Sequence, residues 1–165
     1  MINVYIFSQK QFKAVMKDMG WNDNTIDLIQ DSAIISICNT ATNIVDSSMT
    51  HWFEKNHNNV LNIDFDDTTF DNDELGIHSI SERQASQIVD FFEKNIDKKH
   101  LIVHCEAGIS RSSATALCWI DFLRMNNIRD ITLHQNQSIC PNPKVERLSK
   151  SVSVEILLVA CGCAH

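Results

Sequence analysis

Glycine and proline are scarce in this sequence, with four glycines and two prolines among 165 residues. No stretch rich in Pro, Gly or Ser divides the chain, which excludes a flexible linker, and we predict a single domain over residues 1–165. No fixed-period repeat is present, which excludes a solenoid. The longest late apolar run, residues 156–161, is far shorter than the roughly 20 residues that cross a bilayer, so no membrane-spanning helix is expected.

Basic residues are also few: 14 Lys and Arg against 21 Asp and Glu give a formal net charge of −7. Binding to a nucleic-acid backbone or to an anionic membrane needs clustered Lys and Arg, so we expect neither as a partner. The opening residues, MINVYIFSQK, lack the pattern of a secretory signal, which predicts a cytoplasmic location. In that compartment the six cysteines are expected to stay reduced.

Apolar, β-prone segments alternate with segments of helical periodicity along the chain. The predicted strands cover residues 4–7, 33–40, 60–67 and 101–103. The predicted helices begin at the capping boxes Ser8/Gln11 and Ser81/Gln84, near residue 48, at about residue 110 and at Pro143. This alternation predicts an α/β fold with a central, mainly parallel sheet of four to five strands, flanked by helices on both faces.

The sequence HCEAGISRS, residues 104–112, lies between a predicted strand and a predicted helix. Amides of such a loop and of the first helical turn form a concave anion site. Gly108 suits a tight ring of amides, because a residue without a Cβ tolerates positive φ. The guanidinium of Arg111 matches two oxygens of a tetrahedral anion. The loop therefore predicts a phosphate site.

Cys105 lies at the centre of this loop, where a positive field favours the thiolate, the nucleophilic form of cysteine. We expect phosphoryl transfer to its sulfur, followed by hydrolysis of the cysteinyl phosphate. Ser112 is positioned to assist the departing thiolate, and His104 to orient the loop. The leaving oxygen needs a general acid, for which Asp67 is the first candidate and Asp66 the second.

The pattern His104-Cys105-x-x-Gly108-x-x-Arg111-Ser112 resembles the signature loop of the cysteine-dependent protein tyrosine phosphatases, and most closely that of the dual-specificity branch. The resemblance extends from residue 60 to the segment CPNPKVERL, and it covers a little over half the chain. It implies Cys105 as nucleophile, Ser112 as leaving-group aid and an acid near Asp67. It also implies a phosphate cradle made of the backbone of Glu106, Ala107, Gly108, Ile109, Ser110 and Arg111. Asn142 is expected to support a turn beside the loop.

The family usually places its acid closer to the cysteine than Asp67 lies here, so Asp71 and Asp73 stay open as alternatives. The resemblance implies a protein phosphatase that hydrolyses phosphotyrosine, and also phosphoserine and phosphothreonine if the branch is correct, without metal or cofactor. The alternative is a module that binds phosphoproteins with little or no turnover. Sulfur transfer and arsenate reduction suit this motif less well.

Other residues that could bind metal form no convincing set. Cys161, Cys163 and His165 crowd the last residues without a clear fourth ligand. The remaining histidines show no ligand spacing, and we expect them at the surface: His51, His57, His78, His100 and His134.

Overall fold

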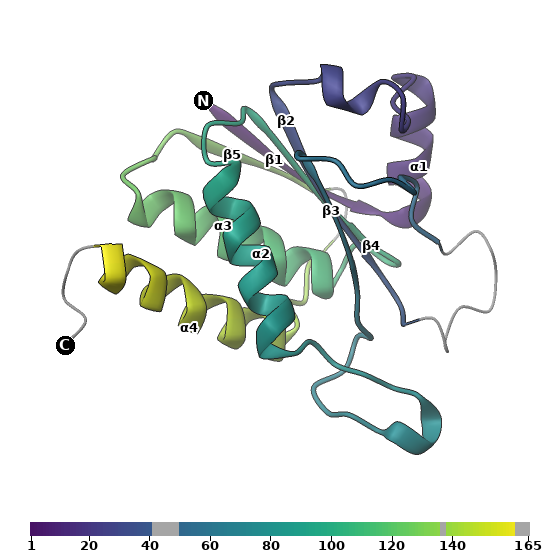
Figure 1. Cartoon of the computed structure of the whole chain (residues 1–165), viewed down its shortest axis with the longest axis vertical. Coiled ribbons are helices and arrows are strands. Elements are labelled where there is room, and N and C mark those ends of the chain that lie inside the picture. The colour runs from purple at the N-terminus through teal and green to yellow at the C-terminus, as the bar shows by residue number, and fades with distance from the viewer. Residues whose placement is uncertain (41–49, 136–137, 161–165) are drawn as a thin grey trace.

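The computed structural model describes residues 1–40, 50–135 and 138–160, so the C-terminal Cys161, Cys163 and His165 lie outside it. Strands and helices alternate along the described chain (Figure 1). The strands are β1 (Ile2–Ser8), β2 (Ser32–Cys38), β3 (Val60–Asp64), β4 (His100–Cys105) and β5 (Ile131–Gln135). The α-helices are α1 (Gln9–Asp18), α2 (Glu82–Lys94), α3 (Arg111–Met125) and α4 (Pro143–Ala160). Two short 3-10 helices are η1 (Ile26–Leu28) and η4 (Asp73–Leu75).

The sheet contains five parallel strands in the order β3-β2-β4-β1-β5. Helix α1 covers one face, and α2, α3 and α4 cover the other (Figure 1). The predicted α/β class, with a mainly parallel sheet and helices on both faces, is confirmed. The sequence analysis missed β5, because this edge strand alternates between half-buried and exposed residues and resembles a polar loop. Thr50–Glu54 are not helical, so the described part of the helix predicted near residue 48 was wrong.

Both predicted capping boxes form. Ser8 caps α1 and Ser81 caps α2, and in each the serine hydroxyl accepts from the N3 amide while the N3 glutamine bonds back to the cap. These reciprocal bonds satisfy amides that a helix start leaves unpaired. The first box has a further consequence, because Ser8 is also the last residue of β1 and pairs with Cys105. Helix α1 therefore starts beside the predicted active-site loop.

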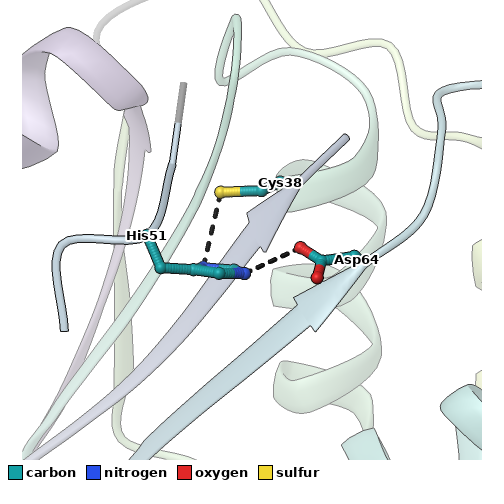
Figure 2. A group of neighbouring side chains, drawn as sticks. All are labelled: Cys38, His51 and Asp64. Atoms are coloured by element: carbon teal, nitrogen blue, oxygen red, sulfur yellow. Dashed lines mark hydrogen bonds and ion pairs between the residues drawn. The ribbon is translucent and has the colours of Figure 1, made fainter. Parts of the chain in front are cut away.

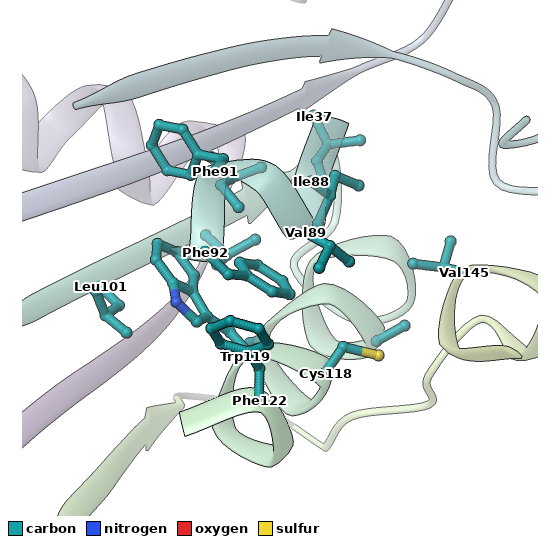
Figure 3. Close-up of a cluster of buried hydrophobic side chains, with 14 of the residues drawn as sticks. Ile37, Ile88, Val89, Phe91, Phe92, Leu101, Cys118, Trp119, Phe122 and Val145 are labelled. Carbon is teal, nitrogen blue, oxygen red and sulfur yellow. The ribbon is translucent and has the colours of Figure 1, made fainter. Parts of the chain in front are cut away.

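The larger of two apolar cores lies between the sheet and α2, α3 and α4 (Figure 3). The ring of Trp119 stacks on Phe92 with centroids 4.8 Å apart, and Phe91 meets it edge-on at 5.8 Å. Cys118 on the same helix is buried, and burial raises the pKa of its thiol to about 12. This cysteine is accordingly an inert core residue. The smaller core, under α1, contains Phe12, Met16, Ile26, Ile34, Phe53, Val60 and Ile102.

All five strands run in the same direction, so their carboxyl ends meet at one edge of the sheet. In register, Cys38 of β2 pairs with Asp64 of β3, and Ser8 of β1 pairs with Cys105 of β4. The predicted nucleophile, the first helix start and the acidic segment after β3 are thus brought together by the sheet topology.

In the described part of the chain, no helix is both long and apolar enough to cross a bilayer.

The expectation that His51 and His57 lie at the surface was wrong. His51 is half-buried above the sheet, and the side chain of His57 is only 2% exposed, between Asp23 at 2.9 Å and Asp27 at 2.9 Å. Burial opposes a charged ring at His57, but hydrogen bonds and the charges of the two carboxylates outweigh it and raise its pKa. Asp23 and Asp27 lie 34 and 30 residues before His57, so no local sequence spacing predicts these contacts.

The His57 contact predicts a pH-dependent contribution to stability. Because folding raises the pKa of His57, the contribution is complete below the ordinary value of 6.5 and is lost as the pH rises through the folded-state pKa. We expect His57→Gln to cost roughly 1 kcal/mol of unfolding free energy at pH 6 and less at pH 10, measured by urea denaturation. His134→Gln, which removes a ring bonded to Asn3, is the control. A His57→Gln deficit that stays constant from pH 6 to pH 10 would contradict this interpretation.

Candidate active site

The loop between β4 and α3 is held from outside by its carbonyl groups. The Gln9 amide donates to the carbonyl of Glu106 at 3.1 Å, and the Cys140 amide donates to that of Ile109 at 2.9 Å. The Asn142 amide donates to the carbonyl of Ser110 at 3.3 Å. A trans peptide points its N–H away from its carbonyl. The N–H groups of Ser110 and Arg111, which belong to the same peptides as the Ile109 and Ser110 carbonyls, therefore face away from these outer contacts.

The sulfur of Cys105 has polar partners although the residue is 1% exposed. The amide of Gly108 donates to it at 3.3 Å, and the hydroxyl of Ser112 lies 3.1 Å away. Gly108 has a φ of 74°, as expected for the tight part of the loop. Helix α3 begins at Arg111, so the positive end of its dipole faces the loop. The sequence-predicted Gly108 and Ser112 thus both contact the sulfur of Cys105.

Arg111 is 2% exposed and fixed at the carboxyl ends of two strands. Its Nη1 donates to the carbonyl of Phe65 at 2.7 Å, to that of Cys38 at 3.4 Å and to Oδ1 of Asn39 at 2.7 Å. Its Nη2 lies 3.8 Å from a carboxylate oxygen of Glu106, whose side chain is 47% exposed. Its Nε is buried and has no hydrogen-bond partner among the described residues. The guanidinium is therefore positioned by Nη1, and its Nε edge is the part suited to a bound anion.

Asp67 is hydrogen-bonded to the loop, whereas Asp66 is not. Oδ1 of Asp67 accepts from the hydroxyl of Ser110 at 2.7 Å and from the side-chain amide of Asn142 at 2.9 Å. Asp67 is exposed, and Asn142 is buried. Asp66 is 7% exposed and accepts from the amide and hydroxyl of Thr40 and from the amide of His78. Asp67 can therefore meet a substrate at the loop, and Asp66 holds the backbone beside it.

The other candidate acids lie in less suitable surroundings. Asp71 accepts from the amide and hydroxyl of Ser79, and these hydrogen bonds lower its pKa, which keeps the carboxylate ionised. The Asp73 side chain is 95% exposed in η4. Asp71 is bonded to Ser79 and Asp73 lies against His78, whereas Asp67 is bonded to Ser110 of the loop, so Asp67 is the better-placed candidate.

His104 is fully buried on β4, and its Nε2 lies 2.8 Å from the hydroxyl of Ser36 on β2. Burial lowers its pKa to about 3, assisted by the positive charges of His51, Lys13 and Arg111 and opposed by a hydrogen bond with the Cys105 backbone. The ring is therefore neutral at pH 7. This agrees with an orienting role for His104 and leaves attack to the neighbouring cysteine.

Cys38, His51 and Asp64 form a second cluster at the same sheet edge (Figure 2). Nδ1 of His51 lies 3.4 Å from the Cys38 sulfur, and Nε2 lies 2.7 Å from Asp64. Ligand atoms of the three residues lie within 4.8 Å of one another, close enough for a metal site. However, the ring turns one nitrogen to the thiol and the other to the carboxylate, so the contacts are those of a hydrogen-bonded chain and do not converge on one point. Burial lowers the pKa of His51, but hydrogen bonds to Asp64 and Cys38 and their charges outweigh it and raise the pKa to about 9.

The sequence analysis did not single out Asn39, Ser36, His51 or Asp64. Asn39 and Asp64 could have been found, because each lies at or just after the carboxyl end of a strand, where ligands bind in such sheets. Ser36 sits within an apolar strand, and His51 carries no spacing signal. Only the folded chain brings these two together.

Comparison of the chain with models of known protein families found no match, and searches among curated proteins and among solved structures found none either. The geometry of the site and the motif of residues 104–112 are therefore the features that indicate a function.

Gly108 offers a direct test of the loop geometry. A Cβ at this position would lie 2.6 Å from the Ser8 nitrogen and 2.7 Å from the Phe7 carbonyl carbon, which are backbone atoms that cannot rotate away. Gly20 has a similar φ of +68° but nothing within 4 Å of the added atom. Both alanine variants should lose roughly 1–2 kcal/mol to the positive φ, and Gly108→Ala about 1–3 kcal/mol more, measured by chemical denaturation. Equal losses would contradict the close approach of β1 to the loop.

Proposed function

We propose that the protein is a cysteine-dependent phosphoric monoester hydrolase acting on phosphorylated proteins, similar to the dual-specificity branch of the protein tyrosine phosphatases. The observation that carries this proposal is the set of polar contacts on the Cys105 sulfur from the Gly108 amide and the Ser112 hydroxyl. The buried thiol of Cys118, away from the loop, instead donates to the carbonyl of Glu146 at 3.7 Å, and burial raises its pKa. The same loop carries a buried Arg111 with an unpartnered Nε.

In the first step, the thiolate of Cys105 attacks phosphorus, so that a P–S bond forms as the P–O bond to the leaving group breaks. The guanidinium of Arg111 and the amides of the loop stabilise the charge on the other phosphoryl oxygens. Asp67, bonded to Ser110 and Asn142 beside the loop, donates a proton to the leaving oxygen.

In the second step, a water molecule attacks phosphorus and breaks the P–S bond. The Asp67 carboxylate formed in the first step accepts the proton of that water. The sulfur leaves as a thiolate, which the hydroxyl of Ser112 at 3.1 Å stabilises by donating a hydrogen bond. Inorganic phosphate is released, and Cys105 and Asp67 return to their starting states.

The proposed substrate class is phosphotyrosine in proteins, together with phosphoserine and phosphothreonine. Glu106 contributes a carboxylate at the loop, and the chain carries a net charge of −7. Both favour phosphorylated segments with basic flanking residues over acidic ones.

One observation favours the second candidate, a phosphoprotein-binding module with little or no turnover. Cys105 is only 1% exposed, whereas Ile109 and Ser110 of the same loop are half-buried, so phosphate can bind at the loop without reaching the sulfur. Measurements of turnover and of binding separate the two functions.

Cys105→Ser tests the nucleophile. A serine hydroxyl is a far weaker nucleophile than a thiolate, so we expect phosphate release from para-nitrophenyl phosphate and from a phosphotyrosine peptide to fall at least about 10⁴-fold. Binding of the phosphopeptide, measured by calorimetry, should persist. Cys118→Ser is the matched control, because it exchanges the same atoms at a buried thiol away from the loop. No turnover by wild type with retained peptide binding would instead identify the binding module.

Asp67→Asn tests the general acid against its neighbour. We expect turnover of a phosphoserine peptide, whose alkoxide leaving group needs a proton, to fall about 10²–10⁴-fold. The loss with para-nitrophenyl phosphate should be smaller, because that leaving group is already stable as an anion. Asp66→Asn should mainly reduce thermal stability, since this buried carboxylate accepts from Thr40 and His78. An inactive Asp66→Asn beside an active Asp67→Asn would reverse the assignment.

A further inference from the structure

A continuous chain of hydrogen bonds leads from the surface to the residue before the nucleophile. Oδ1 of Asp64 lies 2.7 Å from Nε2 of His51, and Nδ1 of the same ring lies 2.7 Å from the hydroxyl of Ser36. That hydroxyl lies 2.8 Å from Nε2 of His104. The Asp64 side chain is 53% exposed, whereas Ser36 and His104 are fully buried. Figure 2 shows the outer part of this chain, with His51 between Cys38 and Asp64.

We propose that Asp64, His51 and Ser36 are positioning residues, which set the direction of proton donation along this chain and thereby the tautomer of His104 beside Cys105.

The direction follows from counting protons along the chain. With His51 protonated, Nε2–H donates to the carboxylate of Asp64, and Nδ1–H donates to the Ser36 oxygen at 2.7 Å in preference to the Cys38 sulfur at 3.4 Å. The single hydroxyl proton of Ser36 must then donate to Nε2 of His104, which has to be the bare nitrogen. His104 is neutral, so its proton lies on Nδ1, on the side away from Ser36.

The charges around His51 support this protonation state. The ring faces Asp64 on β3 and Cys38 on β2. Burial lowers the pKa of His51, but its interactions with these two partners outweigh burial and raise the pKa to about 9. Burial keeps His104 on β4 neutral, assisted by the positive charges of His51, of Lys13 on α1 and of Arg111 on α3. At pH 7, therefore, His51 is the charged member of the chain and His104 is not.

Loss of the His51 proton would reverse the direction in which hydrogen bonds are donated along the chain. A neutral His51 keeps Nε2–H on Asp64, so its Nδ1 becomes an acceptor and takes the Ser36 hydroxyl proton. The Ser36 oxygen is then free to accept from Nε2–H of His104, and Nδ1 of His104 becomes bare.

The consequence for the loop lies at Nδ1 of His104. This atom is buried, and no well-aligned hydrogen bond satisfies it within the described residues. The backbone of Cys105 acts on the ring, and because this contact raises the pKa of His104, the ring is its donor. Only the tautomer with a proton on Nδ1 can both accept from Ser36 and donate toward Cys105.

The ring nitrogens can be observed directly by ¹⁵N NMR of histidine-labelled protein. We expect His104 of the wild type to carry its proton on Nδ1 at pH 7 and at pH 8. Asp64→Asn removes the charge that holds the His51 proton, so at pH 8 His104 should change to the tautomer protonated on Nε2. Asp64 is exposed, so this variant should fold. Asp23→Asn is the matched control, because it removes a carboxylate from a different histidine, His57, and should leave His104 unchanged.

Two results would overturn the proposal: a wild-type His104 protonated on Nε2 at pH 7, or the same tautomer in wild type and Asp64→Asn at pH 8.

The effect on turnover rests on the proposed phosphatase function, whereas the tautomer does not. Ser36→Ala should lower kcat about tenfold with KM unchanged, the size expected for one buried hydrogen bond. Ser32→Ala, on the same strand and also buried, should leave kcat unchanged. Unchanged kcat in Ser36→Ala would overturn the positioning role. An inactive wild type whose His104 tautomer still responds to Asp64→Asn would refute the phosphatase function and support the proton chain.

Discussion

The site depends on the hydrogen bonds that the Arg111 guanidinium makes to the ends of two strands. A buried cation must have its donors satisfied, and here Nη1 meets the carbonyls of Cys38 and Phe65 and the side chain of Asn39. These acceptors belong to the ends of β2 and β3, while Arg111 itself begins α3. One side chain thereby joins two strand ends to the loop that holds Cys105. A substitution that removes the guanidinium would loosen the scaffold as well as any bound anion.

The two faces of the sheet differ in what they supply to the site. The face under α2, α3 and α4 is apolar, with Phe92 and Trp119 stacked at its centre, and it gives the loop a rigid base (Figure 3). The face under α1 carries polar side chains among its apolar ones, and near the site these are Ser36, His51 and His104. Buried polar groups are stable only when paired, so this face forms a hydrogen-bonded chain. The apolar face supplies the packing beneath the loop, and in our proposal the polar face sets the tautomer of His104.

Neighbouring residues of the same type have different surroundings and so different uses. Asp66 is buried and fixes the backbone near Thr40 and His78, while Asp67 is exposed and bonds to Ser110 and Asn142. The cysteines differ in the same way: the Cys118 thiol donates to the carbonyl of Glu146 and burial raises its pKa, whereas the Cys105 sulfur accepts from the amide of Gly108. Residue identity alone does not separate these cases, because the difference is one of solvation and partners.

The sequence alone determined the α/β class, both capping boxes, four of the strands and the loop of residues 104–112, because each depends on short-range spacing that neighbouring residues carry. It missed β5, whose edge position leaves no clear apolar pattern. It ranked Asp67 before Asp66 as the acid, but it could not show the surroundings of either aspartate or of His51, since these come from distant segments. The tertiary structure alone decided those points: the parallel sheet gathers the ends of β2, β3 and β4 at one edge, where Asn39 meets Glu106, Asp64 meets His51 and Asp67 meets Ser110.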